Sequence, residues 1–123
     1  MKNYNKNIGS YGEDLGIKFL IDKGYFILDR NFRNRYGEID AICKFKGLII
    51  FVEIKSRYSS SFGTPLEAIT YSKQKRIINL CKYYIYKKKL FNYNCRFDVI
   101  EVYFNTSNDS NKIIHIEDAF RSY

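Results

Sequence analysis

The chain has 123 residues, and its 21 Lys and Arg outnumber its 13 Asp and Glu to give a net charge of +8. This length predicts a single domain spanning residues 1–123. No apolar run approaches ~18 residues, which predicts that the protein has no membrane-spanning helix. The first residues lack the apolar core of a signal peptide, which predicts a cytoplasmic protein. The charge leaves nucleic acid, an anionic membrane surface and acidic proteins as classes of partner, whereas three Cys without paired spacing and one His argue against a structural zinc site.

Hydrophobic periodicity predicts one helix and three strands in the first half of the chain. A helix with one polar stripe covers residues 10–23, and Gly24 ends it. The strands follow at residues 25–32, 37–45 and 48–57. The last two are joined by a short turn at Lys46-Gly47, and the nearly unbroken apolar run at residues 48–52 is typical of a central strand covered on both faces.

The second half of the chain predicts helices and then two more strands. Thr64, Pro65 and Glu67 have the spacing of a capping box, which is typical of the start of a helix. A longer helix is expected at residues 72–89, followed by strands at residues 96–104 and 112–120. The order α-β-β-β-α-β-β predicts an α/β domain with a mixed central sheet flanked by helices.

Charged side chains interrupt the apolar hairpin of the second and third strands. Because strand side chains alternate, Glu53 and Lys55 project from one face, where two charges are costly unless they are paired, hydrated or bound to a metal. A tight hairpin could set Asp40 beside Glu53. Two carboxylates in contact need a cation to coexist, and Mg²⁺ (or Mn²⁺) fits oxygen ligands of this kind.

The strand that carries Asp40 offers a second carboxylate. Alternation places Glu38, Asp40 and Ile42 on one face and Ile39 on the other. Glu38 is therefore an alternative metal ligand, and its other interpretation is an ion pair with a nearby arginine such as Arg33 or Arg35.

The first helix offers a further carboxylate. Glu13 lies on the same arc as Ile17 and Leu20, away from the polar stripe, so it could reach over the sheet to Asp40 and Glu53. A capping or surface role is the alternative for Glu13.

Such a carboxylate cluster suits phosphodiester hydrolysis. Asp40, Glu53 and the backbone carbonyl of Ile54 would hold the metal, which polarises a phosphoryl oxygen and lowers the pKa of a bound water. Lys55 would position that water or stabilise negative charge at the phosphorus. A lone Glu-x-Lys is more often an ion pair, but here the acidic residues interrupt otherwise apolar faces.

These residues resemble the PD-(D/E)xK nuclease pattern, with Asp40 as the first acid and Glu53-Ile54-Lys55 as the ExK element. Over essentially its whole length the chain also resembles the YraN-like family of small bacterial proteins. The motifs that carry this resemblance are Gly12-Glu13, Gly24-Tyr25, Asn31-Phe32-Arg33, Gly37-Glu38-Ile39-Asp40, Phe51-Val52-Glu53-Ile54-Lys55-Ser56-Arg57, Phe62-Gly63 and Arg96-Phe97-Asp98-Val99.

The resemblance implies a restriction-endonuclease-like αβββαβ core, related in fold to Holliday-junction resolvases. It implies that Glu13, Asp40, Glu53 and Lys55 are the helix acid, the strand acid and the ExK pair of a catalytic site. It also implies a homodimer, which would supply a second active site. One departure from the pattern is Ile39, which stands where the motif's name has Pro.

Basic residues surround these motifs and are candidates for holding a nucleic-acid backbone, since Arg and Lys contacts to phosphate give affinity without sequence readout. They are Arg33, Arg35, Arg57, Lys73, Lys75 and Arg76. The alternative is an ordinary solvated surface. Tyr58 and Phe62 are candidates for substrate contact, and His115 is expected to be structural or exposed.

The sequence thus favours a Mg²⁺-dependent endonuclease acting on DNA, with branched or damaged structures among its candidate substrates and no membrane partner. Two alternatives remain open at this point. One is a nucleic-acid-binding module that keeps the nuclease fold without cutting. The other is a structural or adaptor protein whose carboxylates form an ion-pair network with Lys55 and nearby Arg.

Overall fold

A computed structural model describes residues 8–58, 69–105 and 110–121. Its elements are α1 (Ile8–Asp22), β1 (Phe26–Asn34), β2 (Gly37–Phe45), β3 (Leu48–Tyr58), α2 (Tyr71–Lys88), β4 (Asn94–Phe104) and β5 (Asn111–Phe120). This order confirms the predicted αβββαβ core, which is followed by one more strand. The capping box predicted at Thr64 lies outside the described residues.

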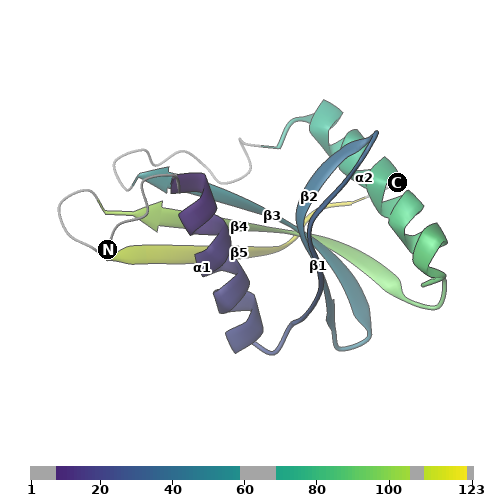
Figure 1. Cartoon of the computed structure of the whole chain (residues 1–123), viewed down its shortest axis with the longest axis horizontal. Coiled ribbons are helices and arrows are strands. Elements are labelled where there is room, and N and C mark those ends of the chain that lie inside the picture. Colours follow the sequence, from purple (N-terminus) through teal and green to yellow (C-terminus); the bar gives the residue numbers. More distant parts are fainter. Residues whose placement is uncertain (1–7, 59–68, 106–109, 122–123) are drawn as a thin grey trace.

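The five strands form one mixed sheet in the order β1-β2-β3-β4-β5 (Figure 1). Neighbouring strands are antiparallel except for β3 and β4, which are parallel. A parallel pair needs a crossover connection, and α2 lies in that connection. No helix within the described ranges is long and apolar enough to cross a membrane.

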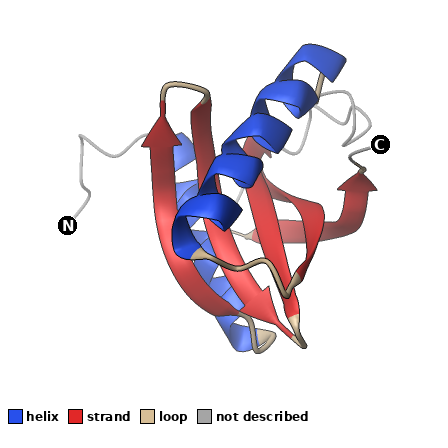
Figure 2. Cartoon of the chain, turned by 90° about the vertical axis from the view of Figure 1, so that its right-hand side faces the viewer, coloured by secondary structure: helices blue, strands red, loops and turns tan. Residues whose placement is uncertain are grey.

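The two helices cover opposite faces of the sheet, with α2 in front of the strands and α1 behind them in Figure 2. Ile50, Val52 and Ile54 of β3 belong to the apolar cluster under α1. Ile49 and Phe51 belong to the cluster under α2. This alternation confirms β3 as a central strand covered on both faces.

The side-chain alternation predicted for the first half of β2 is wrong. Ile39 was expected on the face opposite Ile42, but both lie in the apolar cluster under α2. The ladder between β2 and β3 reaches only to the pair of Ala41 and Val52. Beyond it, the β1–β2 ribbon bends away from the other strands (Figure 1), so a flat-strand pattern no longer describes which way its side chains point.

α1 packs against β3 unusually closely, through two glycines. A Cβ added at Gly12 would lie 1.7 Å from Ser56 Oγ, and one added at Gly16 would lie 3.0 Å from carbons of Ile54. Only glycine leaves room for this approach. It holds Glu13, the residue after Gly12, over the same end of the sheet as β3 residues 54–56.

The start of α2 is fixed by a capping hydrogen bond. Thr70 is extended at the N-cap, and its Oγ1 accepts a hydrogen bond from the backbone N–H of Lys73 at 3.1 Å. Lys73 therefore lies in the first turn of α2, facing the sheet.

Candidate active site

Asp40 and Glu53 meet where β2 parts from β3. Asp40 immediately precedes the last ladder pair, and its Oδ2 accepts a hydrogen bond from the backbone N–H of Ile54 at 2.7 Å. Glu53 is buried, with 8% of its surface exposed. Burial, followed by the negative charge of Glu53, raises the pKa of Asp40 to about 7. The short turn between the strands thus brings these two carboxylates together, as the sequence predicted.

Glu13 joins them from α1. A hydrogen bond with Glu13 and its charge both contribute to the raised pKa of Asp40, after the larger effects of burial and Glu53. Arg30 Nη2 lies 3.9 Å from Glu13 Oε1 and 3.0 Å from Asp14 Oδ1. Glu13 therefore lies between Arg30 and Asp40, which is the inward position predicted for it.

Two lysines approach Glu53. Lys73 Nζ donates a hydrogen bond to Glu53 Oε2 at 2.6 Å, and Lys55 Nζ lies 3.7 Å from the same oxygen. Burial, and then the hydrogen bond and charge of Lys73, lower the pKa of Lys55. Burial also acts to lower the pKa of Lys73, but the hydrogen bond and charge of Glu53 outweigh it, so this pKa is raised. Lys73 is thus the closer cationic partner of Glu53.

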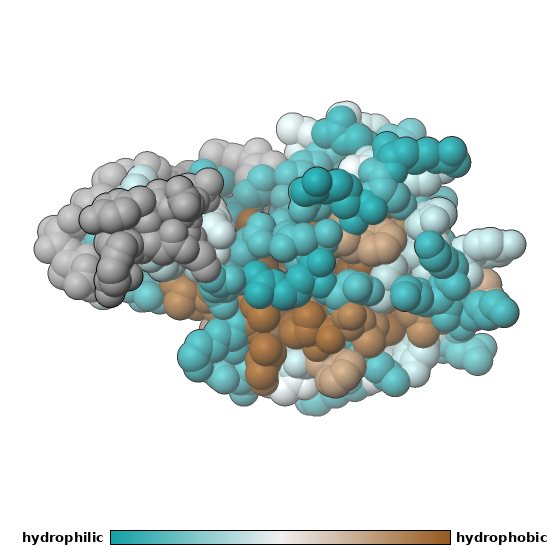
Figure 3. All heavy atoms as spheres, viewed as in Figure 1, coloured by the Kyte–Doolittle hydropathy of each residue, from teal (hydrophilic) through white to brown (hydrophobic). Residues whose placement is uncertain are grey.

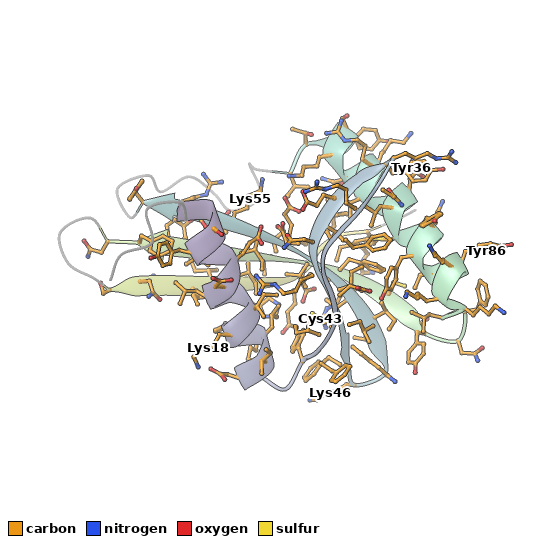
Figure 4. The ribbon with its side chains drawn as sticks, viewed as in Figure 1. Lys18, Tyr36, Cys43, Lys46, Lys55 and Tyr86 are labelled. Carbon is orange, nitrogen blue, oxygen red and sulfur yellow. The ribbon has the colours of Figure 1, made fainter. Side chains whose placement is uncertain are left out.

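A cavity of about 280 Å³ opens beside these groups, between the end of the β1–β2 ribbon and the first turns of α2. Its lining includes Tyr36, Glu38, Asp40, Glu53, Lys73 and Arg76. Figure 4 shows Tyr36 at the ribbon's end and Lys55 on β3, between the two helices in that view. The carboxylates are therefore reachable from solvent through a mixed-charge opening.

The oxygen donors of Asp40, Glu53 and the Ile54 carbonyl fit a hard divalent cation that keeps some of its water ligands. No three Asp, Glu, His or Cys side chains converge as a metal-ligand group in the described part of the chain. Mg²⁺ is commonly held by one or two carboxylates with water and phosphate oxygens completing the shell. Because the N–H and C=O of one strand residue point to the same side, the Ile54 carbonyl faces the edge on which Asp40 lies. The ammonium of Lys73 supplies positive charge at this position in the structure.

The sequence model of the Uncharacterised protein family UPF0102 matches residues 12–102. The chain belongs to the UPF0102 family. A UPF0102 protein of Clostridium perfringens (strain 13) is 53% identical over 121 residues, which are 98% of this chain and 99% of the relative. One of Clostridium botulinum (strain Eklund 17B) is 52% identical over 122 residues, 99% of this chain and 100% of the relative. Membership of UPF0102 confirms the resemblance to YraN-like proteins.

The arginines of the β1–β2 ribbon of this UPF0102 protein already have partners. Arg33 Nη2 lies 3.2 Å from Glu38 Oε2, which confirms the ion pair considered for Glu38. Arg35 donates a hydrogen bond to the hydroxyl of Tyr36 at 3.3 Å. Hydrophilic residues cover this corner of the UPF0102 surface, at the upper right of Figure 3. Arg33 is largely exposed all the same, so its guanidinium can also reach a ligand.

The other predicted phosphate-binding residues separate in space. Arg76 lines the cavity with Lys73, whereas Lys75 lies on the outer face of α2 over the ring of Tyr71. Arg57 Nε lies 3.1 Å from Oε1 of Glu101, a fully buried carboxylate. Of this group, Lys73 and Arg76 are the ones that the UPF0102 fold brings to the carboxylates.

A second polar cluster, around Asp98, was not predicted from the sequence. Arg96 donates two hydrogen bonds to Asp98, at 2.8 and 2.9 Å, and His115 Nε2 lies 2.8 Å from Asp98 Oδ2. Arg96 also donates to the hydroxyl of Tyr25 at 2.8 Å. The cluster links β4 and β5 to the chain just after α1, and it confirms His115 as structural. The available signal was the alternation of Arg96 and Asp98 at the start of a strand whose other residues are mostly apolar.

Glu101 was also missed. It stands beside Lys55 in the parallel register of β3 and β4, and its Oε1 accepts hydrogen bonds from Arg57 and from the Tyr103 hydroxyl. Its Oε2 is buried without a hydrogen-bond partner in the described ranges. Glu101 therefore holds Arg57 in place at the end of the ExK strand.

Proposed function

We propose that this protein is a metal-dependent endonuclease that hydrolyses phosphodiester bonds in DNA at the Asp40–Glu53 site. The observation that carries the proposal is the meeting of the buried carboxylate of Glu53, the half-buried carboxylate of Asp40 and two lysines where β2 parts from β3, beside a cavity open to solvent. Isolated buried acids of like charge are unfavourable, so their juxtaposition is better explained by a cation and a reaction than by stability.

Asp40, Glu53 and the carbonyl of Ile54 would hold Mg²⁺ or Mn²⁺. When bound, such an ion polarises a phosphoryl oxygen and lowers the pKa of a coordinated water. The contribution of the chain is rigid placement, because Asp40 is fixed by the Ile54 N–H and Glu53 by the buried centre of β3.

Lys55 and Glu13 would act around these ligands. The side chain of Lys55 is 25% exposed against 10% for that of Glu53, so its ammonium can stabilise negative charge that develops on a phosphate. Glu13 shares a hydrogen bond with Asp40 and orients that carboxyl group. Glu13 is thus a positioning residue in this proposal.

DNA would be held by the cations at the mouth of the cavity. Arg76 and Lys73 enter from α2, and Arg33 and Arg35 lie at the end of the β1–β2 ribbon. Contacts of this kind neutralise backbone phosphates, so we expect binding to weaken steeply as salt is raised.

A non-catalytic nucleic-acid-binding module is the second candidate. The contact between Lys73 and Glu53 favours it, because an internal ammonium already balances one carboxylate without any metal. The fold would then present the same basic surface to DNA and release it uncut.

A cleavage assay separates the two functions. Linear duplex, single-stranded and four-way-junction DNA are incubated with Mg²⁺ or Mn²⁺ and with wild type, Asp40→Asn or Lys55→Ala. Cleavage by wild type that both variants lose supports the nuclease. Equal cleavage by all three proteins identifies a contaminant, and binding of DNA without any cleavage supports the module.

A further inference from the structure

A second and larger cavity lies at the other end of α2. It is a groove of about 710 Å³ between the last turns of α2 and the adjoining parts of β4 and β5. The apolar side chains that line it are Leu48, Ile78, Cys81, Ile85, Phe97 and Phe120. Lys73 and Tyr86 are thirteen positions apart on α2, so this groove lies about 20 Å along the helix from the carboxylate site.

Two aromatic side chains form one wall of the groove and remain in solvent. Tyr86 is 73% exposed and Phe91 is 63% exposed, and their rings meet edge to face with centroids 6.1 Å apart. Figure 4 shows Tyr86 projecting outward from α2. Large exposed aromatic groups beside an apolar groove mark a binding surface more often than a free one.

The helix beside the groove is strongly cationic. α2 contains six Lys and Arg and no Asp or Glu. Lys75, Lys82 and Tyr86 recur at intervals of seven and four residues, which places them on one stripe of the helix. Lys82 lines the groove and is exposed to solvent.

These charges decide between two occupants. A second copy packed helix against helix would set six cations against six, which opposes association. A polyanion matches the stripe, and a nucleobase matches the groove because it has a flat apolar face that stacks on aromatic rings. Bases inside a duplex are already stacked and cannot enter, whereas those of an unpaired strand can.

We propose that this groove binds an unpaired nucleic-acid strand, with a base against Tyr86 and Phe91 and backbone phosphates on Lys82 and Lys75. The inference takes its class of partner from the proposed function. It adds to that function a strand-specific subsite along α2, so that a substrate with a single-stranded arm next to the cleavage site is preferred to an unbranched duplex.

The test measures the fluorescence anisotropy of labelled oligothymidylate and of a blunt duplex of equal length, in EDTA so that no metal-dependent cleavage intervenes. We expect wild type to prefer the single strand. Tyr86→Ala and Phe91→Ala should each weaken that binding about tenfold, since stacking on one aromatic ring contributes on this scale. Lys82→Ala should reduce the slope of log affinity against log salt by about 0.7. The matched control is Tyr83→Ala, an exposed tyrosine of α2 outside the groove, which should bind as wild type does.

Three results would overturn the inference: equal binding by wild type and both aromatic variants, no preference for the single strand, or a dimer of wild type that Tyr86→Ala and Phe91→Ala dissociate. The last result would assign the groove to a second copy. Asp40→Asn keeps the two proposals distinct, because it should lose any cleavage while its binding of oligothymidylate should still be weakened by Tyr86→Ala and Phe91→Ala. If binding depends on the groove but no DNA is cleaved, the proposed nuclease activity is refuted and the subsite stands. If DNA is cleaved in the presence of metal but the groove variants bind as wild type does, the subsite is refuted and the nuclease activity stands.

Discussion

Lys73 and a divalent cation would compete for the same carboxylate. The ammonium lies 2.6 Å from Glu53 Oε2, and its side chain is 30% exposed, so it can move away when another cation arrives. Metal affinity in the wild type would therefore be lowered by the free energy of this ion pair. For a partly exposed pair that free energy is about 1 kcal/mol.

Lys73→Met should accordingly tighten Mn²⁺ binding about fivefold. Titration calorimetry or the electron paramagnetic resonance signal of free Mn²⁺ measures this. Lys75→Met is the control, because Lys75 lies on the outer face of α2 over Tyr71 and away from Glu53. Unchanged or weaker Mn²⁺ binding by Lys73→Met would show that Lys73 does not occupy the cation position.

Asp40 should destabilise the metal-free protein at alkaline pH. Its pKa rises from the ordinary 3.8 to about 7 on folding, so between these values the folded protein binds a proton that the unfolded chain releases. Stability contributed by this group therefore falls as pH rises from about 4 to about 7 and stays low above it.

Asp40→Asn should thus raise the free energy of unfolding at pH 8 in EDTA, by about 2 kcal/mol. Thermal denaturation measures the change, with Glu38→Gln as a control for an exposed ion pair. With saturating Mn²⁺ the order should reverse, since only the wild type gains stability from bound metal. If Asp40→Asn were less stable than wild type in EDTA, this would contradict the inference that the Asp40 charge is unfavourable beside Glu53.

At the residue scale, the sequence predicts contacts that are local and misses those that require the fold. Asp40 and Glu53 are joined by a short turn, so alternation and turn length were enough to pair them. Lys73 was predicted to bind nucleic acid, and its contact with Glu53 was not foreseen because it forms only when α2 crosses back over the sheet. The contact between Asp98 and His115 likewise depends on the pairing of β4 with β5, whereas the hydrogen bonds from Arg96 to Asp98 are local to β4.

At the element scale, the position of α1 depends on two glycines, whose lack of a side chain allows the helix to approach the sheet closely. Gly12 and Gly16 let its backbone approach Ser56 and Ile54 of β3, and this approach sets the distance of Glu13 from the carboxylates. A methyl group at either position must push the helix outward or displace its neighbour.

Gly12→Ala should destabilise the protein by about 1–3 kcal/mol, despite the better helix propensity of Ala, because the new Cβ overlaps Ser56 Oγ. Urea denaturation measures this loss. Adding Ser56→Ala removes the overlapping oxygen and should recover most of it. Lys18→Ala, on the exposed side of α1, is the control. Equal stability of Gly12→Ala and wild type would show that α1 can shift without cost.

Element boundaries followed well from periodicity and from end signals such as Gly24, which has a φ of +96° at the end of α1. The face assigned to Ile39 was wrong because alternation assumes a flat strand, and the β1–β2 ribbon is bent. Sequence reasoning also left open which glycines are structural. Gly12 lies inside a helix and forms neither a turn nor a cap, so its sequence position gives no reason for a glycine. The reason is its close contact with Ser56, which only the folded structure shows.

At the scale of the whole molecule, the Asp98 cluster makes the stability of the protein depend on pH in the acidic range. Burial acts to raise the pKa of Asp98, but hydrogen bonds from His115, Arg96 and the Asp118 backbone outweigh it, so the pKa lies below 3.8. The group therefore adds stability above pH 4 that is lost as pH falls through its lower folded-state pKa.

Asp98→Asn should lower the free energy of unfolding at pH 7 by about 3 kcal/mol, since it leaves the buried side of Arg96 without its counter-charge. The difference from wild type should shrink as pH is lowered below about 4. Circular dichroism melts across this range measure both effects. Glu117→Gln, a more exposed partner 3.7 Å from Arg96, should change stability little. A constant difference at all pH values would exclude this role for the Asp98 charge.

The three glycines of α1 at positions 9, 12 and 16 have one further consequence, which concerns local opening. Each costs about 1 kcal/mol of helix propensity, so α1 would not persist without the sheet behind it. Hydrogen exchange should therefore find the amides of α1 opening more readily than those of β3, well below the free energy of global unfolding. In such an open state Glu13 departs while Asp40 and Glu53 stay together on the β2–β3 hairpin, so the helix acid can be withdrawn from the site without unfolding the domain.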